Sequence, residues 1–439
     1  MGLSPVGGSD RQAVVVVGCG YVGLSVAAGF AELGSTVLGV EVDENRLELL
    51  RTGRIPFHEP GLEDLVSASL ETGGLSFTGD LRVAAAQGGI VFICVPTPSS
   101  GDGSADLSIV EGVIRVIREV LPPGSTVVLK STVPVGASEV VSAWLERDDV
   151  EVVSNPEFLQ AGRAVSGFRR PDRILIGAWS EEAGDLVARL FEGVDAPVIR
   201  MDPREAELVK YASNAYLALR LSFVNTVAEM CELGGGDAWR VMEGMGLDHR
   251  IGTGFLRPGP GWGGSCLPKD VRAMAAAGHA VGADMSLLDS ADRLNQQRFT
   301  RVAEQVAEQF DGLLAGRRIA VWGLTFKAGT DDLRDSPALA VVRRLIEGGA
   351  SVVAYDPMVQ VLPLEGLSLR ASPEEAVLDA ECLVVLTEWP EFAGTSAPSN
   401  ATALSRCHVI DARGVLDAAA WRAAGFEVAT VGVGRSGRA

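Results

Sequence analysis

At 439 residues the chain is too long for one hydrophobic core and is expected to divide into two or three domains. Its 47% apolar and 22% charged residues are typical of a soluble globular protein. The net charge of −19 argues against nucleic acid and anionic membranes as partners, because a polyanion would be repelled. The sequence has neither a signal-peptide pattern nor a run of roughly 18 apolar residues. We therefore expect a cytoplasmic protein.

The first part of the chain alternates short β-branched runs with segments of helical length. Strands are expected over residues 13–18, 35–43, 89–98, 125–132 and 150–157. Runs that are apolar throughout are typical of a parallel sheet covered on both faces. Residues 1–202 are therefore predicted to form a doubly wound, Rossmann-like α/β domain.

The pattern changes near Pro203 to long amphipathic stretches, with helices expected over 203–235 and 286–310. Residues 203–311 are predicted to form a helical middle section. Alternation then returns, with strands expected over 318–324, 350–357, 381–389 and 407–414. The predicted fold is two Rossmann-like domains joined by a helical section, the second covering residues 312–439.

A glycine pattern follows the first expected strand. Gly18, Gly20 and Gly23 form G-x-G-x-x-G, which encloses Tyr21 and Val22 and precedes a helical segment. The second strand ends in Glu41, placed to accept both ribose hydroxyls of a dinucleotide and to repel a 2′-phosphate. The pattern favours NAD over NADP. Arg46 is placed to reach the cofactor, or is equally a solvated helix arginine.

Lysine is scarce, with four residues among 38 basic ones: Lys130, Lys210, Lys269 and Lys327. A lysine ammonium is compact and can exchange a proton, unlike arginine. Lys210 and Asn214 stand one helical turn apart, where an ammonium and an amide can hold one reacting oxygen. The alternative for Lys210 is a surface lysine.

Cys266 lies in "GPGWGGSCLPKD", residues 259–270, after four glycines and before an expected helix start. A helix N-terminus lowers the pKa of a thiol and makes it a better nucleophile. Asp270 would return to the same face and could hold a water or orient a base. The alternative is a buried structural cysteine. The other five cysteines lack metal-ligand spacing, so plain buried thiols and no metal site are expected.

Taken together, the motifs resemble the UDP-glucose/GDP-mannose dehydrogenase family over essentially the whole chain. The resemblance rests on the glycine pattern, "STVPVG", "NPEFL", "ELVKYASNAYLA", "HRIGTGFLRPGPGWGGSCLPKD", "GLTFKAGTDDLRDSP" and "DARGVLD". It implies a four-electron, NAD-dependent oxidation of the C6 alcohol of a nucleotide sugar, with UDP-glucose giving UDP-glucuronate. The resemblance further implies a cytoplasmic enzyme of UDP-glucuronate and polysaccharide biosynthesis.

The resemblance also implies residue roles. Cys266 would be the nucleophile, Lys210 and Asn214 would stabilise the reacting oxygen, and Glu157 would be the acid/base. Asp270 and Thr132 would hold a water, and Thr97, Thr132 and Arg334 would contact NAD. Substrate contacts would come from Phe158, Leu159, Phe255, Arg257, Trp262, Gly263, Phe326, Lys327 and Arg413. Arg250 would reach the neighbouring subunit's site, in a homodimer or larger homo-oligomer built on the helical section.

One position departs from the family pattern. Many relatives carry glutamate where this chain has Ala161, so its NAD affinity and sugar preference are expected to differ. A dTDP-glucose, GDP-mannose or UDP-amino-sugar substrate stays open. A two-electron dehydrogenase or epimerase would not need Cys266, and a non-catalytic nucleotide-sugar sensor would need neither Cys266 nor Lys210.

Overall fold

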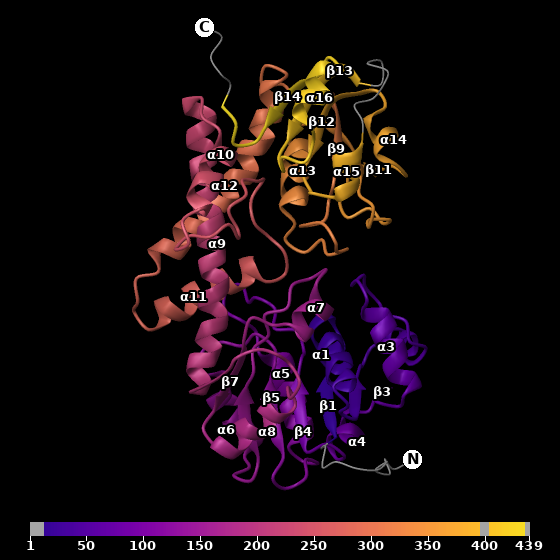
Figure 1. The fold of residues 1–439 in the computed structure, drawn as a ribbon, viewed down its shortest axis with the longest axis vertical. Coiled ribbons are helices and arrows are strands. Elements are labelled where there is room, and N and C mark those ends of the chain that lie inside the picture. Colours follow the sequence, from indigo (N-terminus) through magenta and orange to yellow (C-terminus); the bar gives the residue numbers. More distant parts are fainter. Residues whose placement is uncertain (1–12, 396–403, 435–439) are drawn as a thin grey trace. The chain divides into compact units, whose positions relative to one another are not determined.

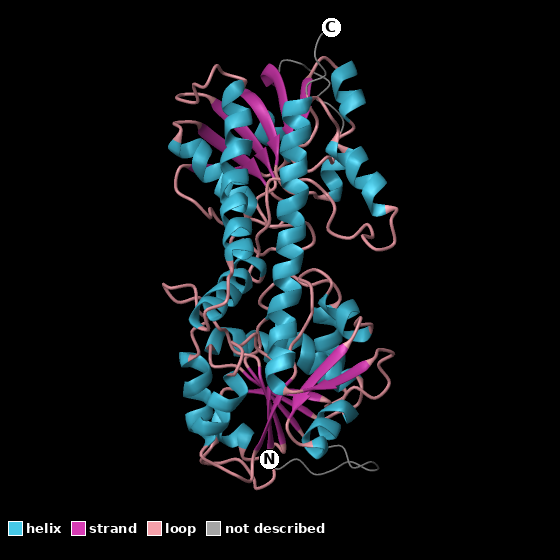
Figure 2. Cartoon of the chain, turned by 90° about the vertical axis from the view of Figure 1, so that its left-hand side faces the viewer, coloured by secondary structure: helices cyan, strands magenta, loops and turns pink. Residues whose placement is uncertain are grey.

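The computed structural model describes residues 13–395 and 404–434. The chain divides into two compact units, residues 1–212 and 213–439, and each is built around its own sheet (Figure 1). In Figure 2 the magenta strands of each sheet lie between layers of cyan helices. The predicted class, two doubly wound α/β sheets, is confirmed.

Unit 1 has an eight-stranded sheet in the order β3-β2-β1-β4-β5-β6-β7-β8. Its first six strands follow the 3-2-1-4-5-6 order of a dinucleotide-binding fold. Neighbours pair in parallel except β6 and β7, which are antiparallel. The strands expected from the sequence, β1, β2, β4, β5 and β6, all pair in parallel, as predicted. The strands are β1 (Val14–Val17), β2 (Val37–Val40), β3 (Leu75–Thr78), β4 (Ile90–Ile93), β5 (Thr126–Leu129), β6 (Glu151–Ser154), β7 (Ile174–Ala178) and β8 (Val198–Met201).

Both faces of this sheet are buried. Successive strand residues point to opposite faces, so Val14 and Val16 join one apolar core while Val15 and Val17 join the other. This explains why β1 reads as four consecutive valines. The covering helices are α1 (Tyr21–Glu32), α2 (Glu44–Arg51), α3 (Leu62–Glu71), α4 (Leu81–Ala85), α5 (Ser108–Ile117), α6 (Ala137–Leu145), α7 (Ala164–Arg169) and α8 (Glu181–Arg189).

Unit 2 repeats the same strand order in a six-stranded parallel sheet, β11-β10-β9-β12-β13-β14. Its core is aromatic on one face, where Trp322 stacks on Phe392 and meets the edge of Trp421. The strands are β9 (Arg318–Trp322), β10 (Ser351–Tyr355), β11 (Leu367–Leu369), β12 (Ala380–Val385), β13 (Leu404–Asp411) and β14 (Glu427–Thr430).

The helical middle section is present as expected. Helix α9 (Pro203–Gly234) contains the boundary between the units, and α12 (Ser286–Glu308) matches the second expected helix. The remaining helices are α10 (Ala238–Gly246), α11 (Leu267–Ala280), α13 (Pro337–Glu347), α14 (Pro373–Val377), α15 (Pro390–Gly394) and α16 (Ala418–Ala423). Within the described ranges, no helix is long and apolar enough to cross a membrane.

Sequence reasoning missed five strands: β7, and the four that end the two sheets, β3, β8, β11 and β14. These edge strands are short and mix polar with apolar residues, as in "LSFT" of β3 and "EVAT" of β14. An edge strand is less covered by helices, so its sequence carries a weaker apolar signal.

Gly23 and Gly20 offer a matched test of this packing. A Cβ on Gly23 would lie 1.8 Å from the carbonyl oxygen of Gly18, whereas a Cβ on Gly20 meets nothing within 4 Å. We expect Gly23→Ala to destabilise unit 1 by about 3 kcal/mol, because α1 must move off β1. Gly20→Ala should cost less than about 1 kcal/mol. Thermal unfolding followed by circular dichroism compares the two, and equal losses would contradict the assigned packing.

Candidate active site

The strand order of unit 1 reverses between β1 and β4, where a doubly wound fold binds its ligand. Gly18 follows β1 with a φ of 91°, and a side chain there would meet the backbone of Cys94. Gly20 precedes the first turn of α1 and faces open space. Backbone N–H groups at such a helix start bind phosphate. The glycines therefore fit the pyrophosphate of a dinucleotide.

Glu41 lies directly after β2 and is 7% exposed. Its Oε1 accepts the N–H of Asp43 at 3.0 Å, which fixes the carboxylate at the carboxyl end of the sheet. This is the position from which an acidic residue binds ribose hydroxyls. The residue types present thus fit NAD.

Other predicted cofactor residues lie at the same sheet edge. Thr97 follows β4, and its hydroxyl donates to the carbonyl of Thr132, beyond β5, at 2.8 Å. Tyr21 stacks on Phe57 with ring centroids 4.0 Å apart, at the start of α1. Arg46 is exposed on α2, so the choice between a cofactor contact and a solvated arginine stays open.

Glu157 and Lys210 form a buried ion pair in unit 1. The Lys210 ammonium donates to Glu157 Oε1 at 2.9 Å and to the Glu157 carbonyl at 2.7 Å, and both side chains are at most 6% exposed. The N–H of Leu159 donates to Glu157 Oε2. Lys210 is therefore not a surface lysine. It is fixed on α9 against the loop after β6.

Phe158 lies next to this pair. The guanidinium of Arg173 lies 3.9 Å from its ring centroid and the Lys210 ammonium 5.2 Å from it. Glu157, Phe158 and Leu159 line a cavity of about 330 Å³ within unit 1. Beyond Ala161, the loop is held by Glu59, which accepts the N–H groups of Gly162 and Ala164.

Sequence reasoning gave no role to Lys130. It follows β5, is 6% exposed, and donates to Asn155 Oδ1 at 2.9 Å. Burial lowers the pKa of Lys130 to about 8, partly opposed by the nearby Glu157 carboxylate. Asn155 in turn donates to the Leu175 carbonyl at 2.6 Å. The scarcity of lysine was the signal that could have identified it.

In unit 2, Cys266 stands at the N-cap of α11, with Pro268 in the first turn, as expected. Asp270 is fully buried. Its Oδ2 accepts from the Asn214 amide and its Oδ1 from the Lys269 ammonium, each at 2.6 Å. Asn214 and Asp270 are thus brought together, and Lys269 is a partner that sequence reasoning missed.

The glycines before Cys266 are needed for close packing. A Cβ on Gly263 would lie 2.0 Å from the Asp335 carbonyl oxygen, and one on Gly264, whose φ is 84°, 2.8 Å from the Phe326 ring. Trp262 is 3% exposed and its indole donates to the Ser222 hydroxyl, so its side chain belongs to the core. A substrate contact by Trp262 stays a prediction.

The other predicted sugar residues are more exposed. Phe255 is 41% exposed with a φ of 56°, and Arg257 is exposed in the same loop. The Arg250 guanidinium pairs with Asp248 at 2.6 Å on the surface. The structure places these side chains where a ligand or a partner chain can reach them.

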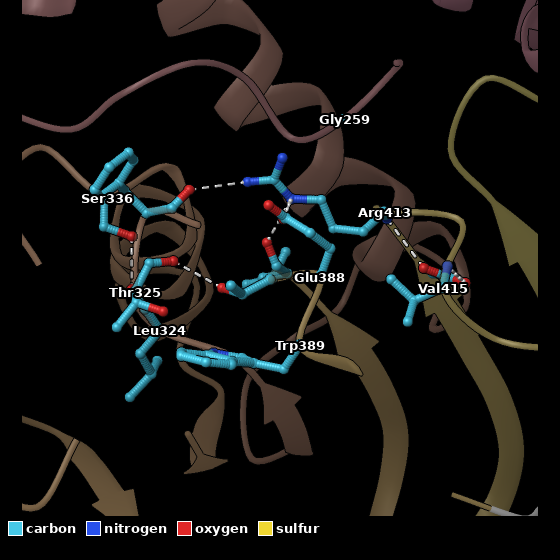
Figure 3. A network of polar contacts seen from close by, with 12 residues as sticks. Gly259, Leu324, Thr325, Ser336, Glu388, Trp389, Arg413 and Val415 are labelled. Atoms are coloured by element: carbon cyan, nitrogen blue, oxygen red, sulfur yellow. Dashed lines mark hydrogen bonds and ion pairs between the residues drawn. The ribbon is translucent and has the colours of Figure 1, made fainter. Parts of the chain in front are cut away.

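Three of the predicted nucleotide residues lie at the switch point of unit 2, between β9 and β12, whereas Phe158 and Leu159 lie in unit 1. Phe326 and Lys327 follow β9, and the Lys327 ammonium lies 5.7 Å from the Phe326 ring centroid. Arg413 follows β13 and donates to the carbonyls of Leu386 and Phe326. Figure 3 shows its guanidinium beside Glu388, with which it forms an ion pair. Arg334, called a cofactor residue, pairs with Asp332 at 2.7 Å.

Buried hydroxyls and carboxylates support the loops that follow β9, β12 and β13. Figure 3 shows Ser336 donating to the Leu324 carbonyl, and the Thr387 hydroxyl donates to the Thr325 carbonyl. The Asp411 carboxylate accepts the N–H groups of Arg413 and Val415. Among the described residues, no group of three or more His, Cys, Asp or Glu could hold a metal ion.

Lys130 gives a test of stability against pH. Because its pKa is about 8 in the fold and 10.5 as an ordinary lysine, folding must bury the charged amine below pH 8. Between pH 8 and 10.5 the unfolded chain binds more protons, so stability from this group rises with pH. Below pH 8 the buried charge of Lys130 lowers the free energy of unfolding by about 3 kcal/mol. Replacing the lysine by an apolar residue would leave the Asn155 carbonyl without this donor, at a cost of about 1 kcal/mol.

We therefore expect Lys130→Met to be more stable than the wild-type chain at pH 7 by about 2 kcal/mol. The difference should shrink between pH 8 and 10.5 as the wild-type amine loses its proton. Denaturant unfolding of both proteins across this range measures it. A difference that stays constant with pH would show that Lys130 is not a buried cation.

Similarity to known proteins extends over nearly the whole chain. Residues 12–195 match the NAD binding domain of the UDP-glucose/GDP-mannose dehydrogenase family, 204–297 its central domain and 320–418 its UDP binding domain. A UDP-glucose 6-dehydrogenase of Rhizobium meliloti is 40% identical, with 95% of this chain and 99% of that protein covered. One from Pseudomonas aeruginosa is also 40% identical, with 96% and 98% covered.

Solved structures of similar fold include dehydrogenases that act on nucleotide sugars. A UDP-glucose dehydrogenase from the archaeon Pyrobaculum islandicum superposes with a TM-score of 0.87 at 39% identity, covering 96% of this chain and all of that one. A UDP-D-ManNAc dehydrogenase from Pyrococcus horikoshii gives 0.86 at 28% identity, covering 96% and 99%. Because the three domains of one family match in order over nearly the full length, the chain belongs to the UDP-glucose/GDP-mannose dehydrogenase family and is an NAD-dependent oxidoreductase.

Proposed function

We propose that this enzyme oxidises the C6 alcohol of UDP-glucose to the carboxylate of UDP-glucuronate, through a covalent intermediate on Cys266. The observation that carries the proposal is the arrangement at α11, where Cys266 occupies the N-cap position and the buried Asp270 accepts from Asn214 and Lys269. A two-electron dehydrogenase or a non-catalytic sensor does not need a thiol at this place. A four-electron oxidation gains from one, because the thiol can hold the aldehyde covalently between the two hydride transfers.

In the first half of the reaction, C6 loses a hydride to NAD and its hydroxyl loses a proton, giving an aldehyde. The Cys266 sulfur then adds to the carbonyl carbon, and the thiol proton ends on the oxygen. This thiohemiacetal keeps the aldehyde from diffusing away while the cofactor is exchanged. The Lys210 ammonium and the Asn214 amide supply one charged and one neutral donor for the reacting oxygen.

In the second half, the thiohemiacetal loses a hydride to a second NAD and a proton from its hydroxyl, giving a thioester. Water adds to the thioester carbon, the C–S bond breaks, and the thiol recovers a proton. Asp270 and Thr132 would hold this water and Glu157 would take its proton. The ion pair with Lys210 holds the Glu157 carboxylate in one place.

UDP-glucose is favoured over the other nucleotide sugars by the relatives. The UDP-glucose enzymes are 39–40% identical to this chain, against 28% for the UDP-D-ManNAc enzyme. The match of residues 320–418 to the family's UDP binding domain supports a nucleotide-sugar substrate. Phe326, Lys327 and Arg413 would contact the nucleotide, and Phe255, Arg257 and Gly263 the sugar.

Cys266→Ala tests the mechanism. The wild-type enzyme should form two NADH per UDP-glucose consumed. With dTDP-glucose, GDP-mannose or UDP-amino sugars it should form NADH more slowly or not at all. The variant keeps the loop and the start of α11, so it should bind NAD and UDP-glucose normally but form less than about 1% of the acid, because no comparable nucleophile replaces the thiol. Cofactor absorbance and chromatography of the products measure both.

Ser265→Ala is the matched control, since it removes a neighbouring hydroxyl in contact with the Cys266 sulfur at 3.7 Å. It should retain most of the activity. Full acid yield from Cys266→Ala, or one NADH per sugar from the wild-type enzyme, would refute the covalent route.

We further propose that the enzyme is a homodimer that pairs through α9. Tyr216, Phe223 and Met230 recur every seven residues on this helix and are 62%, 54% and 75% exposed. Such spacing puts them on one helix face, and large apolar side chains exposed in a row are typical of a protein interface. In such a dimer, Arg250 would reach the partner's site.

Replacing Phe223 and Met230 together by glutamate should break the dimer, because burying two carboxylates against apolar side chains is costly. Light scattering should give twice the chain mass of 46.0 kDa for the wild-type protein and the single mass for the variant. Val361→Glu, an equally exposed apolar site in unit 2, is the control and should stay dimeric. A wild-type monomer would refute the proposal.

The cytoplasm is the compartment we propose for this reaction. NAD is available there, and the reducing conditions keep thiols such as that of Cys266 reduced. The described cysteines at positions 19, 94, 231, 266 and 382 form no disulfide.

A further inference from the structure

The segment that leads to Cys266, residues 259–265, has neither helix nor strand and contains four glycines. Glycine allows the chain close approach to its neighbours but leaves it many conformations. The position of the thiol must therefore be imposed by contacts from outside the segment. The structure contains such contacts on α12 and α9.

Asn295 on α12 holds the backbone of Trp262 from both sides. Its Oδ1 accepts the Trp262 N–H and its amide donates to the Trp262 carbonyl, each at 2.8 Å. Asn295 is 3% exposed, so both halves of its amide need a partner inside the protein. One side chain thus satisfies both backbone groups of one loop residue.

Gly259 is held in the same way, at the start of the segment. Its N–H donates to Asn225 Oδ1 and its carbonyl accepts from Arg298 Nε, both at 3.0 Å. Between the two anchors, a Cβ on Gly261 would lie 2.4 Å from the Phe299 ring and 2.8 Å from Asn295 Oδ1. The segment therefore lies directly against α12.

The far side of the segment faces the loop after β9. Gly263 packs against the Asp335 carbonyl and Pro337, and Gly264 packs against the Phe326 ring. Three residues separate the Asn295 clamp at Trp262 from Cys266. A shift of the chain at Trp262 would be carried directly to the N-cap of α11.

We propose that Asn295 is a positioning residue that sets the place of the Cys266 thiol. The inference rests on the proposed role of Cys266 for its catalytic consequence. A thiol in one fixed place captures the aldehyde before release, because effective concentration depends on geometry. Loss of the clamp would let aldehyde escape after one hydride transfer.

Two replacements separate the parts of the clamp. Asn295→Asp keeps the acceptor for the Trp262 N–H and removes the donor to its carbonyl, at nearly the same size. Asn295→Leu removes both. Ser222→Ala is the matched control, because it frees the Trp262 indole and leaves the backbone clamp intact.

The first measurement uses the full chain without substrate. Iodoacetamide alkylates Cys266, and mass spectrometry of the peptide that contains it gives the rate. We expect this rate to change at least fivefold in Asn295→Leu, less in Asn295→Asp, and less than twofold in Ser222→Ala. Thermal midpoints identify any variant that fails to fold. If Asn295→Leu does not fold, the alkylation rate of the isosteric Asn295→Asp variant tests the inference.

The second measurement is the ratio of NADH formed to UDP-glucose consumed. It should fall from two toward one in Asn295→Leu and stay at two in Ser222→Ala, while KM for NAD changes less than twofold. General loss of structure reduces the amount of active enzyme but does not change this ratio. An unchanged alkylation rate and ratio in both Asn295 variants would overturn the inference.

The two proposals fail in different ways. If the alkylation rate responds to Asn295 but the wild-type enzyme forms no NADH with any nucleotide sugar, Asn295 positions the thiol and the proposed function is wrong. If the wild-type enzyme forms two NADH per sugar and the Asn295 variants do the same, the function stands and the positioning role is wrong.

Discussion

The site depends on one constraint, which is that every buried charge on α9 and on the residues it contacts must be paired. An ammonium or carboxylate inside a protein must be paired, since an isolated buried charge costs several kcal/mol. Lys210 meets this need at Glu157, and one turn later Asn214 binds the buried Asp270, which Lys269 also pairs. These contacts fix the side chains for which we propose catalytic roles. The same atoms are also the donors that a reacting oxygen would need, so substrate would have to compete with partners already in place.

Both units use the same strand order, and in both the residues that fit a nucleotide follow the central strands. In unit 1 these are the glycines after β1, and in unit 2 they are Phe326 and Lys327 after β9. A parallel sheet brings its carboxyl ends to one edge, so loops that are distant in sequence meet there. This explains how one chain can take a dinucleotide and a nucleotide sugar with two copies of one architecture.

The segment before Cys266 combines two opposite requirements. It has to pass so close to Phe326, Phe299 and the Asp335 carbonyl that only glycine fits, and it has to hold a thiol in one place. Buried polar side chains on α9 and α12 reconcile the two by binding backbone groups at Gly259 and Trp262. Rigidity here comes from the partners of the loop and not from the loop itself.

The sequence by itself determined the order of the domains, the apolar strands at the centre of each sheet, the long helices and the motifs at Gly18, Cys266 and Lys210. Each is a local signal: β-branched runs, helical periodicity, or a residue type that one chemistry requires. The edge strands and the antiparallel β7 have no such local signal, because these segments become strands only through pairing with their neighbours in the sheet. Lys130 has no neighbour in sequence that would pair it. It donates to Asn155, and burial lowers its pKa against the opposing effect of Glu157. Asn295 is one of several polar residues on α12, and only the packing of α12 against residues 259–265 makes it different from the glutamines beside it. Hydrogen bonds across 33 residues of sequence leave no periodicity, so only the tertiary structure decided which polar residues hold the site.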